Sequence, residues 1–185
     1  MRLRTRVDAV MIGAGTMRVE RYGRLVEDPG LRARRERAGL PHDPLAVIVS
    51  ASLDLPWDAP LFTSPGRVLI FTDEGGEPPP TTASLRVVRA PGGIDLADCL
   101  RHLRTERGIR ALLCEGGPSL HGELQALGLV DELFLTIAPK LAGGAGPRIL
   151  EGGLPEVAGL ELVWLLERQG ELYARYGVRS AGGSA

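Results

Sequence analysis

Hydrophobic residues along the chain gather in short continuous runs, each about as long as a β-strand. Six such runs occur, at residues 7–13, 45–49, 67–72, 85–88, 109–114 and 130–138. Most of them are rich in β-branched residues, and the run at 85–88 is the weakest. Continuous apolar runs, in contrast to alternating ones, are typical of strands that are covered on both faces of a sheet.

Helical signals are fewer. Residues 95–108 carry the clearest one, because Asp95 suits the N-cap, the apolar positions that follow share one face, and Gly108 suits the C-terminal end. Residues 118–127 predict a second helix, and residues 32–37 predict a short, solvent-exposed helical turn.

The order of these elements predicts an α/β fold. Short connections between strand, helix and strand along residues 109–138 imply parallel pairing with a right-handed crossover. Residues 161–167 and 172–178 flank the turn 168–171, which predicts an antiparallel hairpin. We therefore expect a mixed, mainly parallel sheet that is flanked by helices, with a C-terminal antiparallel hairpin at one side.

Length and charge narrow the possible functions. The chain of 185 residues fits one domain, expected at residues 1–179 with a disordered tail at 180–185. The formal net charge is −1 and no block of like charges stands out, which argues against a nucleic-acid or membrane-surface partner. No apolar run approaches the ~20 residues that span a bilayer, and no signal-peptide pattern follows Met1. The expected location is the cytoplasm.

Cysteines and histidines give no sign of a disulfide or a metal site. Cys99 and Cys114 are isolated in apolar surroundings, which is typical of buried, reduced thiols. The three histidines are too few and too scattered for a metal cluster. We therefore expect no metal.

The most informative segment is Glu115-Gly116-Gly117-Pro118-Ser119-Leu120, where a predicted strand leads into a predicted helix. Two glycines let backbone N–H groups approach a ligand closely, and proline suits the first helical position. The helix start then offers unpaired N–H groups and a partial positive charge, which favour an anion such as a phosphate. The same residues also suit a turn that only reverses the chain into the helix.

Other strands end in small or hydroxyl residues, as expected where ligands bind at the carboxyl ends of a parallel sheet. These endings are Gly13-Ala14-Gly15-Thr16, Ser50-Ala51-Ser52 and Thr72. A Rossmann fingerprint is rejected because Arg18 stands where the third glycine belongs. Glu115 and Glu20 are the acid–base candidates, and the main chemistry is expected to belong to a cofactor.

In combination these segments resemble a known family. VDAVMIGAGTMR at 7–18, CEGGPSL at 114–120, GLVDELFLTIAPK at 128–140 and the glycine pair 143–144 together are similar to the reductase domain of riboflavin biosynthesis. That domain is the C-terminal half of bifunctional deaminase-reductases and has the dihydrofolate-reductase-like fold. The resemblance runs from Arg6 to about residue 178.

The resemblance implies NADPH-dependent reduction of a ribosylamino-pyrimidine phosphate, with hydride transfer to the sugar C1′, in a homodimer that pairs through its C-terminal strands. Glu115 is the expected catalytic residue, and Glu20, Arg24 and Glu115 are expected to bind the substrate. Ser50 or Ser52 would face the adenosine 2′-phosphate. The residues expected to bind the cofactor are Gly15, Thr16, Ser50, Ser52, Thr72, Gly116, Gly117, Pro118, Ser119 and Leu120.

The chain departs from the family pattern in two places. The family has Asp, then Asn or Asp, then Pro after the first glycine loop, where this chain has Glu20-Arg21-Tyr22. Family members also begin with a strand carrying a Ser-Leu-Asp-Gly-like motif, and residues 1–7 resemble only the end of the helix that follows it. Our hypothesis is that the protein starts upstream. Two alternatives stay open: a dihydrofolate-reductase-like enzyme for another pterin or pyrimidine, and an inactive NADPH-binding dimer.

Overall fold

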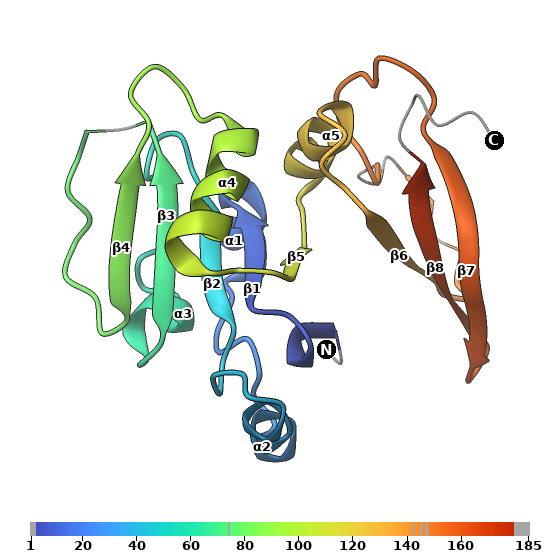
Figure 1. Cartoon of the computed structure of the whole chain (residues 1–185), viewed down its shortest axis with the longest axis horizontal. Helices are drawn as coiled ribbons and strands as arrows, with labels where there is room; N and C mark the ends of the chain where they lie inside the picture. The colour runs from blue at the N-terminus through green and yellow to red at the C-terminus, as the bar shows by residue number, and fades with distance from the viewer. Residues whose placement is uncertain (1–2, 74, 142, 145, 147, 180–185) are drawn as a thin grey trace. The chain divides into compact units, whose positions relative to one another are not determined.

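The computed structural model describes residues 3–73, 75–141, 143–144, 146 and 148–179. The chain forms two compact units, which divide after Gly117 (Figure 1). The predicted tail at 180–185 lies outside the described residues. None of the described helices is long and apolar enough to cross a membrane.

A five-stranded parallel sheet forms the centre of the first unit (Figure 1). Its order is β4-β3-β2-β1-β5, and every neighbouring pair is parallel. The strands are β1 (Ala9–Gly13), β2 (Leu45–Val49), β3 (Arg67–Thr72), β4 (Ser84–Arg89) and β5 (Leu112–Cys114). The continuous apolar runs therefore predicted the parallel strands correctly, and the α/β prediction is confirmed.

Both faces of the central strands are buried, which explains why their sequences do not alternate. On one face Ile12, Ile48 and Ile70 pack in a cluster with Met17 of α1 (Ala14–Glu20) and Phe62 of α3 (Pro60–Thr63). The alternate residues of these strands, which point to the other face, are buried as well. There Phe71 contacts the ring of His102 on α4 (Leu96–Arg107) edge-on, with ring centroids 5.7 Å apart.

Helix α4 has the ends that its sequence predicts. The Asp95 side chain accepts a hydrogen bond from the N–H of Asp98, and Gly108 caps the C-terminus in the left-handed region at φ 65°. Its cysteine, Cys99, is buried and forms no disulfide, as expected for a reduced thiol.

The helical turn predicted at residues 32–37 is part of helix α2 (Pro29–Arg37), but one of its residues, Arg35, is not solvent-exposed. Arg35 is fully buried, and its guanidinium donates to the carbonyls of Arg4, Val7 and Pro41. Two of these carbonyls lie 31 and 28 residues away in the chain. The helix therefore anchors the short 3-10 helix η1 (Leu3–Thr5), through contacts that no local pattern could indicate.

The second unit holds α5 (Pro118–Ala126) and a three-stranded antiparallel sheet in the order β6-β8-β7. Its strands are β6 (Glu132–Ile137), β7 (Gly159–Arg168) and β8 (Glu171–Arg179). The predicted hairpin is confirmed, with a two-residue turn at Gln169 and Gly170, whose φ values of 56° and 80° match a turn that needs positive φ at both positions.

Strand β6 pairs with β8 in the antiparallel sense over six residues. Strand β5 belongs to the first unit and β6 to the second, so the parallel pairing of these two segments stays a prediction.

Candidate functional site

The carboxyl ends of β1, β2, β3 and β5 lie along the same edge of the first unit's parallel sheet, because parallel neighbours end on the same side. Seven of the predicted cofactor residues lie at or just after these strand ends. Gly15 and Thr16 lie in the first turn of α1, Thr72 is the last residue of β3, and the loops after β2 and β5 carry Ser50, Ser52, Gly116 and Gly117. The structure thus brings together at one edge residues that are spread over about a hundred positions of the chain.

The loop after β5 lies tightly against the start of α1. The N–H of Gly13 donates to the carbonyl of Gly116 at 2.7 Å, and the peptide bond between Gly116 and Gly117 is cis. A Cβ atom built on Gly117 would lie only 2.7 Å from Oγ1 of Thr16. The glycine thus leaves room for the side chain of Thr16, whereas close approach of a ligand to this loop stays a prediction.

The hydroxyls after β2 and β3 lie in different surroundings. Ser50 is only 2 % exposed, and its Oγ has no hydrogen-bond partner among the described residues. Thr72 is fully buried and its Oγ1 donates to the carbonyl of Ala51 at 2.9 Å, whereas Ser52 is exposed. A buried hydroxyl without a partner is uncommon and costs free energy, so Ser50 marks a place where a polar ligand group or water would be stabilised.

A guanidinium that the sequence analysis did not select lies at the same edge. Arg18 of α1 donates from Nη1 to the carbonyl of Asp54 at 2.8 Å and pairs with the Asp54 carboxylate at 3.4 Å. It therefore contacts the loop that also carries Ser50 and Ser52. Local sequence shows at position 18 only that the third glycine of a Rossmann fingerprint is missing, although an arginine one turn into a helix at this edge suits an anion.

Glu115 is the centre of a polar cluster. Arg4 donates from Nε to Oε1 at 2.6 Å and from Nη2 to Oε2 at 2.5 Å, and the hydroxyl of Tyr22 donates to Oε2 at 3.0 Å. The side chains of Arg4 and Glu115 are 15 % and 20 % exposed, so the fork is sheltered from water. Sequence reasoning selected Glu115 but missed both of its partners.

The cluster changes the ionisation of its members. Burial, together with the negative charge of Glu115, raises the pKa of Tyr22 to about 12. The hydrogen bond to Glu115 raises the pKa of Arg4. Tyr22 therefore keeps its proton through the neutral range and acts towards Glu115 as a donor.

The other two predicted substrate residues are placed differently. Glu20 is exposed at the end of α1. Arg24 is exposed and pairs with Asp43 at 3.0 Å, and Asp43 also accepts, through its carbonyl, from Arg67 at the first residue of β3. Arg24 thus lies at the amino edge of the sheet, so the structure does not bring it to the edge that carries the strand-end loops.

The predicted residues at the start of α5 belong to the second unit and contact a loop of that unit. The hydroxyl of Ser119 donates to the carboxylate of Glu151 at 2.7 Å, and the N–H of Glu151 donates to the carbonyl of Pro118. Leu120 is buried. Phosphate binding by these residues stays a prediction, and Glu151 is a neighbour that the sequence analysis did not foresee.

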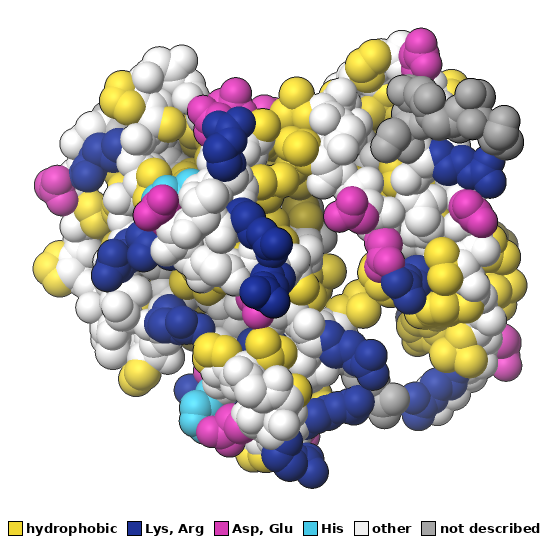
Figure 2. All heavy atoms as spheres, in the orientation of Figure 1, with side chains coloured by type: hydrophobic (Ala, Val, Ile, Leu, Met, Phe, Trp, Pro, Cys, Tyr) yellow, Lys and Arg dark blue, Asp and Glu magenta, His cyan; other side chains and the backbone are white. Residues whose placement is uncertain are grey.

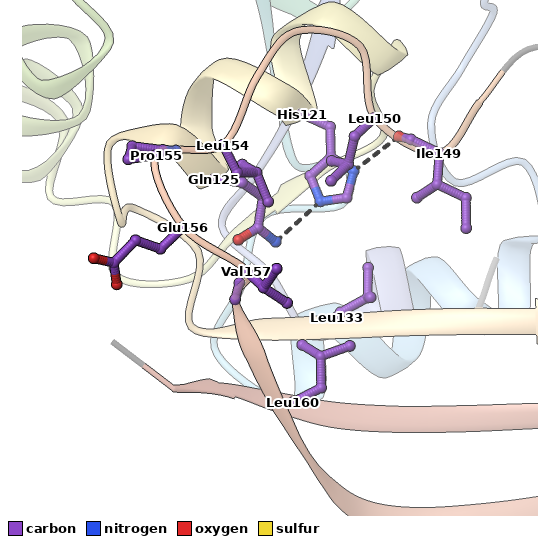
Figure 3. A pocket seen from close by; sticks show the side chains of 11 residues that line it. His121, Gln125, Leu133, Ile149, Leu150, Leu154, Pro155, Glu156, Val157 and Leu160 are labelled. Atoms are coloured by element: carbon purple, nitrogen blue, oxygen red, sulfur yellow. Dashed lines mark hydrogen bonds between the residues drawn. The ribbon is translucent and has the colours of Figure 1, made fainter. Parts of the chain in front are cut away.

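Helix α5 also lines an apolar pocket of about 420 Å³ within the second unit (Figure 3). Its walls are β6, β7 and the segment between them, including Leu133, Leu160 and Val157. Both ring nitrogens of His121 are engaged, Nδ1 with the carbonyl of Ile149 and Nε2 with Gln125, each at 3.2 Å (Figure 3). The pocket therefore presents no unengaged cation that would hold a phosphate.

Neither a reactive thiol nor a metal-binding cluster is found among the described residues. Cys114 is a free cysteine, and burial raises the pKa of its thiol, so it is a poor nucleophile at neutral pH. Among the residues that the structure describes, no group of three or more histidine, cysteine, aspartate or glutamate side chains could hold a metal ion.

Comparison with known proteins identifies the family. The model of the RibD C-terminal domain matches residues 1–169. The chain belongs to the RibD C-terminal domain family. The chain is 32% identical over 160 residues to the 2,5-diamino-6-ribosylamino-4(3H)-pyrimidinone 5′-phosphate reductase of Methanothermobacter thermautotrophicus, covering 82% of this chain and 68% of that protein. The Archaeoglobus fulgidus protein of the same description is 28% identical, with 82% and 71% covered.

Solved structures agree with this RibD-type fold. A pyrimidine reductase-like protein from Corynebacterium diphtheriae superposes with a TM-score of 0.77 at 25% identity, covering 96% of this chain and 78% of that one. RibD of Acinetobacter baumannii gives a TM-score of 0.77 at 17% identity, covering 95% of this chain and 48% of that one. The predicted resemblance to riboflavin-biosynthesis reductases is thereby confirmed.

Proposed function

We propose that this protein is a reductase of riboflavin biosynthesis that uses NADPH to reduce a ribosylamino-pyrimidine phosphate at the sugar C1′. The observation that carries the proposal is the 32% identity, over 82% of the chain, to a protein described as a reductase of such a pyrimidinone phosphate. The edge of the parallel sheet, where the strand-end loops meet, is the place where an α/β fold of this kind binds ligands.

The residues at this edge fit a phosphorylated dinucleotide. Ser50 supplies a buried hydroxyl without a partner among the described residues, and Arg18 of α1 supplies a guanidinium that contacts the loop after Ser50. Thr16 lies against Gly117 at the start of α1. Ser50 and Arg18 would hold the adenosine-side phosphate, and Thr16 with Gly116 and Gly117 would hold the central phosphates. When bound, NADPH supplies the hydride.

Glu115 is proposed to bind the substrate. An ionised carboxylate only accepts hydrogen bonds, so it suits the amino and ring N–H groups of a diaminopyrimidinone and offers the substrate's phosphate no donor. The Arg4 fork already neutralises its charge, and the side chain is largely sheltered from water, where a hydrogen bond to a ligand counts for more.

The first experiment measures NADPH binding by fluorescence titration and then NADPH oxidation with the ribosylamino-pyrimidine phosphate and with dihydrofolate. Oxidation with the pyrimidine phosphate is expected. Oxidation with dihydrofolate alone would move the activity to a pterin, and binding without any oxidation would make the protein a non-catalytic NADPH binder. Absence of NADPH binding would defeat the proposal.

The role of Glu115 has a matched test. Glu115→Gln is expected to leave the Kd of NADPH within about twofold and to lower kcat/KM for the pyrimidine by about a hundredfold. Glu132→Gln is the control, since Glu132 accepts the same kind of arginine fork, from Arg175, on an exposed face of the second unit. Equal loss of NADPH binding and turnover in Glu115→Gln would contradict a role on the substrate side.

We further propose that the protein is a homodimer through β7. Every residue of β7 is exposed, and Figure 2 shows hydrophobic side chains gathered over this strand. Large exposed apolar patches are rare on monomers and mark protein interfaces. The contributing side chains are Leu160, Leu162, Val163, Trp164, Leu165 and Leu166.

Light scattering after size-exclusion chromatography tests this assembly. The wild-type protein is expected to elute with the mass of two chains, and Trp164→Glu is expected to shift it to one, because a charge would then have to be buried in an apolar interface. A wild-type protein that stays monomeric at high micromolar concentration would exclude the β7 dimer.

A further inference from the structure

The Glu115 cluster is more fully built than a surface ion pair. Three hydrogen bonds reach one carboxylate: Oε2 accepts from Arg4 and Tyr22, whereas Oε1 accepts only from Arg4 among the described residues. A carboxylate has about four acceptor positions, two on each oxygen. One position on Oε1 is therefore left for a further donor.

Arg4 is itself held in place. Its Nη1 donates to the carbonyl of Leu25 at 3.1 Å, and its own carbonyl accepts from the fully buried Arg35 at 2.6 Å. The guanidinium is thus tied through its side chain and through its backbone. Because the guanidinium is planar and rigid, a fork held in this way sets the plane of the carboxylate that it binds.

Tyr22 fixes the other side of the same carboxylate. Its ring packs against the core cluster of the first unit and lies 5.3 Å from the guanidinium carbon of Arg4, within the range of a cation–π contact. Its raised pKa, about 12, keeps the phenol protonated, so the hydroxyl donates to Oε2 throughout the neutral range. The hydroxyl contributes to the cluster, and the ring contributes to the core.

We propose that Arg4 and Tyr22 are positioning residues that hold Glu115 with Oε1 directed at an N–H donor of the substrate, so that the cluster recognises the pyrimidine ring and not the phosphate. The inference rests on the proposed reductase function. Neither residue needs to contact the substrate. Two donors on Oε2 occupy that oxygen, and the anionic phosphate of the substrate finds in Glu115 no hydrogen-bond donor.

Tyr22→Phe is the sharpest test, because it removes one hydroxyl and keeps the ring that packs in the core. It is expected to lower kcat/KM for the ribosylamino-pyrimidine phosphate about tenfold, chiefly through a higher KM, while the Kd of NADPH changes by less than about twofold. Tyr173→Phe is the matched control, since Tyr173 also donates its hydroxyl to a glutamate, Glu171, in the second unit. The control should leave kcat/KM unchanged.

Arg4 is tested by two substitutions. Arg4→Lys keeps the charge and loses the fork, and Arg4→Met loses both. If the fork positions Glu115, Arg4→Lys should recover no more than about a third of the kcat/KM that Arg4→Met loses. If the positive charge alone mattered, Arg4→Lys should have the kcat/KM of the wild type. Arg175→Lys, which breaks the exposed fork to Glu132, is the control and should be neutral. If the Arg4 variants do not fold, Tyr22→Phe alone decides.

Three results are distinguishable. Wild-type turnover with a tenfold loss in Tyr22→Phe supports the inference. Wild-type turnover with unchanged kcat/KM and KM in Tyr22→Phe, even with lower thermal stability, overturns the inference and leaves the reductase function standing. A wild-type protein that neither binds nor turns over any ribosylamino-pyrimidine phosphate overturns the function, and the inference with it.

Discussion

Replacing Gly117 by alanine probes the tightest contact at the proposed cofactor edge. The new Cβ would lie 2.7 Å from Thr16 Oγ1, about 0.7 Å inside the 3.4 Å at which ordinary contact begins. Relief requires a change in the χ1 angle of Thr16 or a shift of the loop. Inserting a methyl group into a packed site costs about 1–3 kcal/mol, so we expect the free energy of unfolding to fall by about 2 kcal/mol.

The measurement is urea unfolding of the first unit, followed by tryptophan fluorescence. The chain has two tryptophans, of which Trp57 packs on Phe62 in the first unit, with ring centroids 4.8 Å apart. A Trp164→Phe background leaves Trp57 as the reporter. Gly66→Ala is the control, because a Cβ there meets nothing within 4 Å, and it should change stability by no more than about 1 kcal/mol.

A double-mutant cycle isolates the contact. In a Thr16→Ala background the oxygen that the new Cβ meets is gone, so Gly117→Ala should cost less than about 0.5 kcal/mol, with a coupling energy of about 1.5 kcal/mol. The reasoning is refuted if Gly117→Ala costs the same in both backgrounds. NADPH binding is measured separately, and Gly117→Ala should lower the affinity at least tenfold in both backgrounds. A folded Gly117→Ala protein with wild-type affinity would show that the phosphates do not bind at this loop.

Three further outcomes follow from single sites. Gly122→Ala would place a Cβ 1.9 Å from the carbonyl oxygen of Glu151, a backbone atom that cannot rotate away, so a loss on the order of 3 kcal/mol is expected in urea unfolding; a neutral result would show that this loop is not seated on α5. Ser50→Ala removes a buried hydroxyl without a partner among the described residues, so the protein without ligand should be as stable as wild type or up to about 1 kcal/mol more stable, while NADPH affinity falls; destabilisation without loss of affinity would contradict the assignment. The pKa of Tyr22 is raised from 10.0 to about 12, so its contribution to stability is fully present below pH 10 and is lost as pH rises through about 12; the tyrosinate absorbance that develops near pH 12 should be smaller in Tyr22→Phe than in the wild type, and no such difference would disprove the buried hydrogen bond.

Much of the fold could be predicted because its signals are local. A strand that is buried on both faces has a continuous apolar sequence, and the capping residues of a helix, such as Asp95 and Gly108 of α4, indicate where it begins and ends. The run at 109–114 shows the limit: β5 begins only at Leu112, because the N–H groups of Arg110 and Ala111 donate to the side chain of Asp8 at 2.8 and 2.9 Å in place of a neighbouring strand. Nothing near Arg110 in the sequence indicates that partner.

Helix α1 shows a second limit. It begins directly after β1, within Gly13-Ala14-Gly15, and lasts seven residues. Its sequence is too short and too mixed to carry a helical period, and Met17 is its only buried residue. The helix is stabilised by the sheet that it covers, so the pattern could not reveal it, and Arg18 was therefore not recognised as a residue at the ligand edge.

The candidate site, too, is predicted only where its residues are neighbours in the sequence. The motif after β5 indicates Glu115 and the glycines, because an acid, two glycines and a proline follow one another directly at a strand end. The partners of Glu115 were not readable, since Tyr22 and Arg4 lie 93 and 111 residues away. The motif therefore predicts the glutamate, whereas the residues that orient it can be identified only in the folded structure.

The structure also changes which residue carries the cofactor argument. The sequence predicts a glycine loop that lets phosphates approach, yet at Gly117 the neighbouring group is the side chain of Thr16, a contact that the fold alone would require. Glycine at 117 is thus necessary with or without a ligand, so its presence does not distinguish a ligand-binding role from a purely structural one. Ser50 does discriminate, because burying a hydroxyl without a partner destabilises the protein alone and is reasonable only if something polar joins it. The two substitutions should therefore separate: Gly117→Ala lowers stability and NADPH affinity together, whereas Ser50→Ala lowers NADPH affinity without lowering stability.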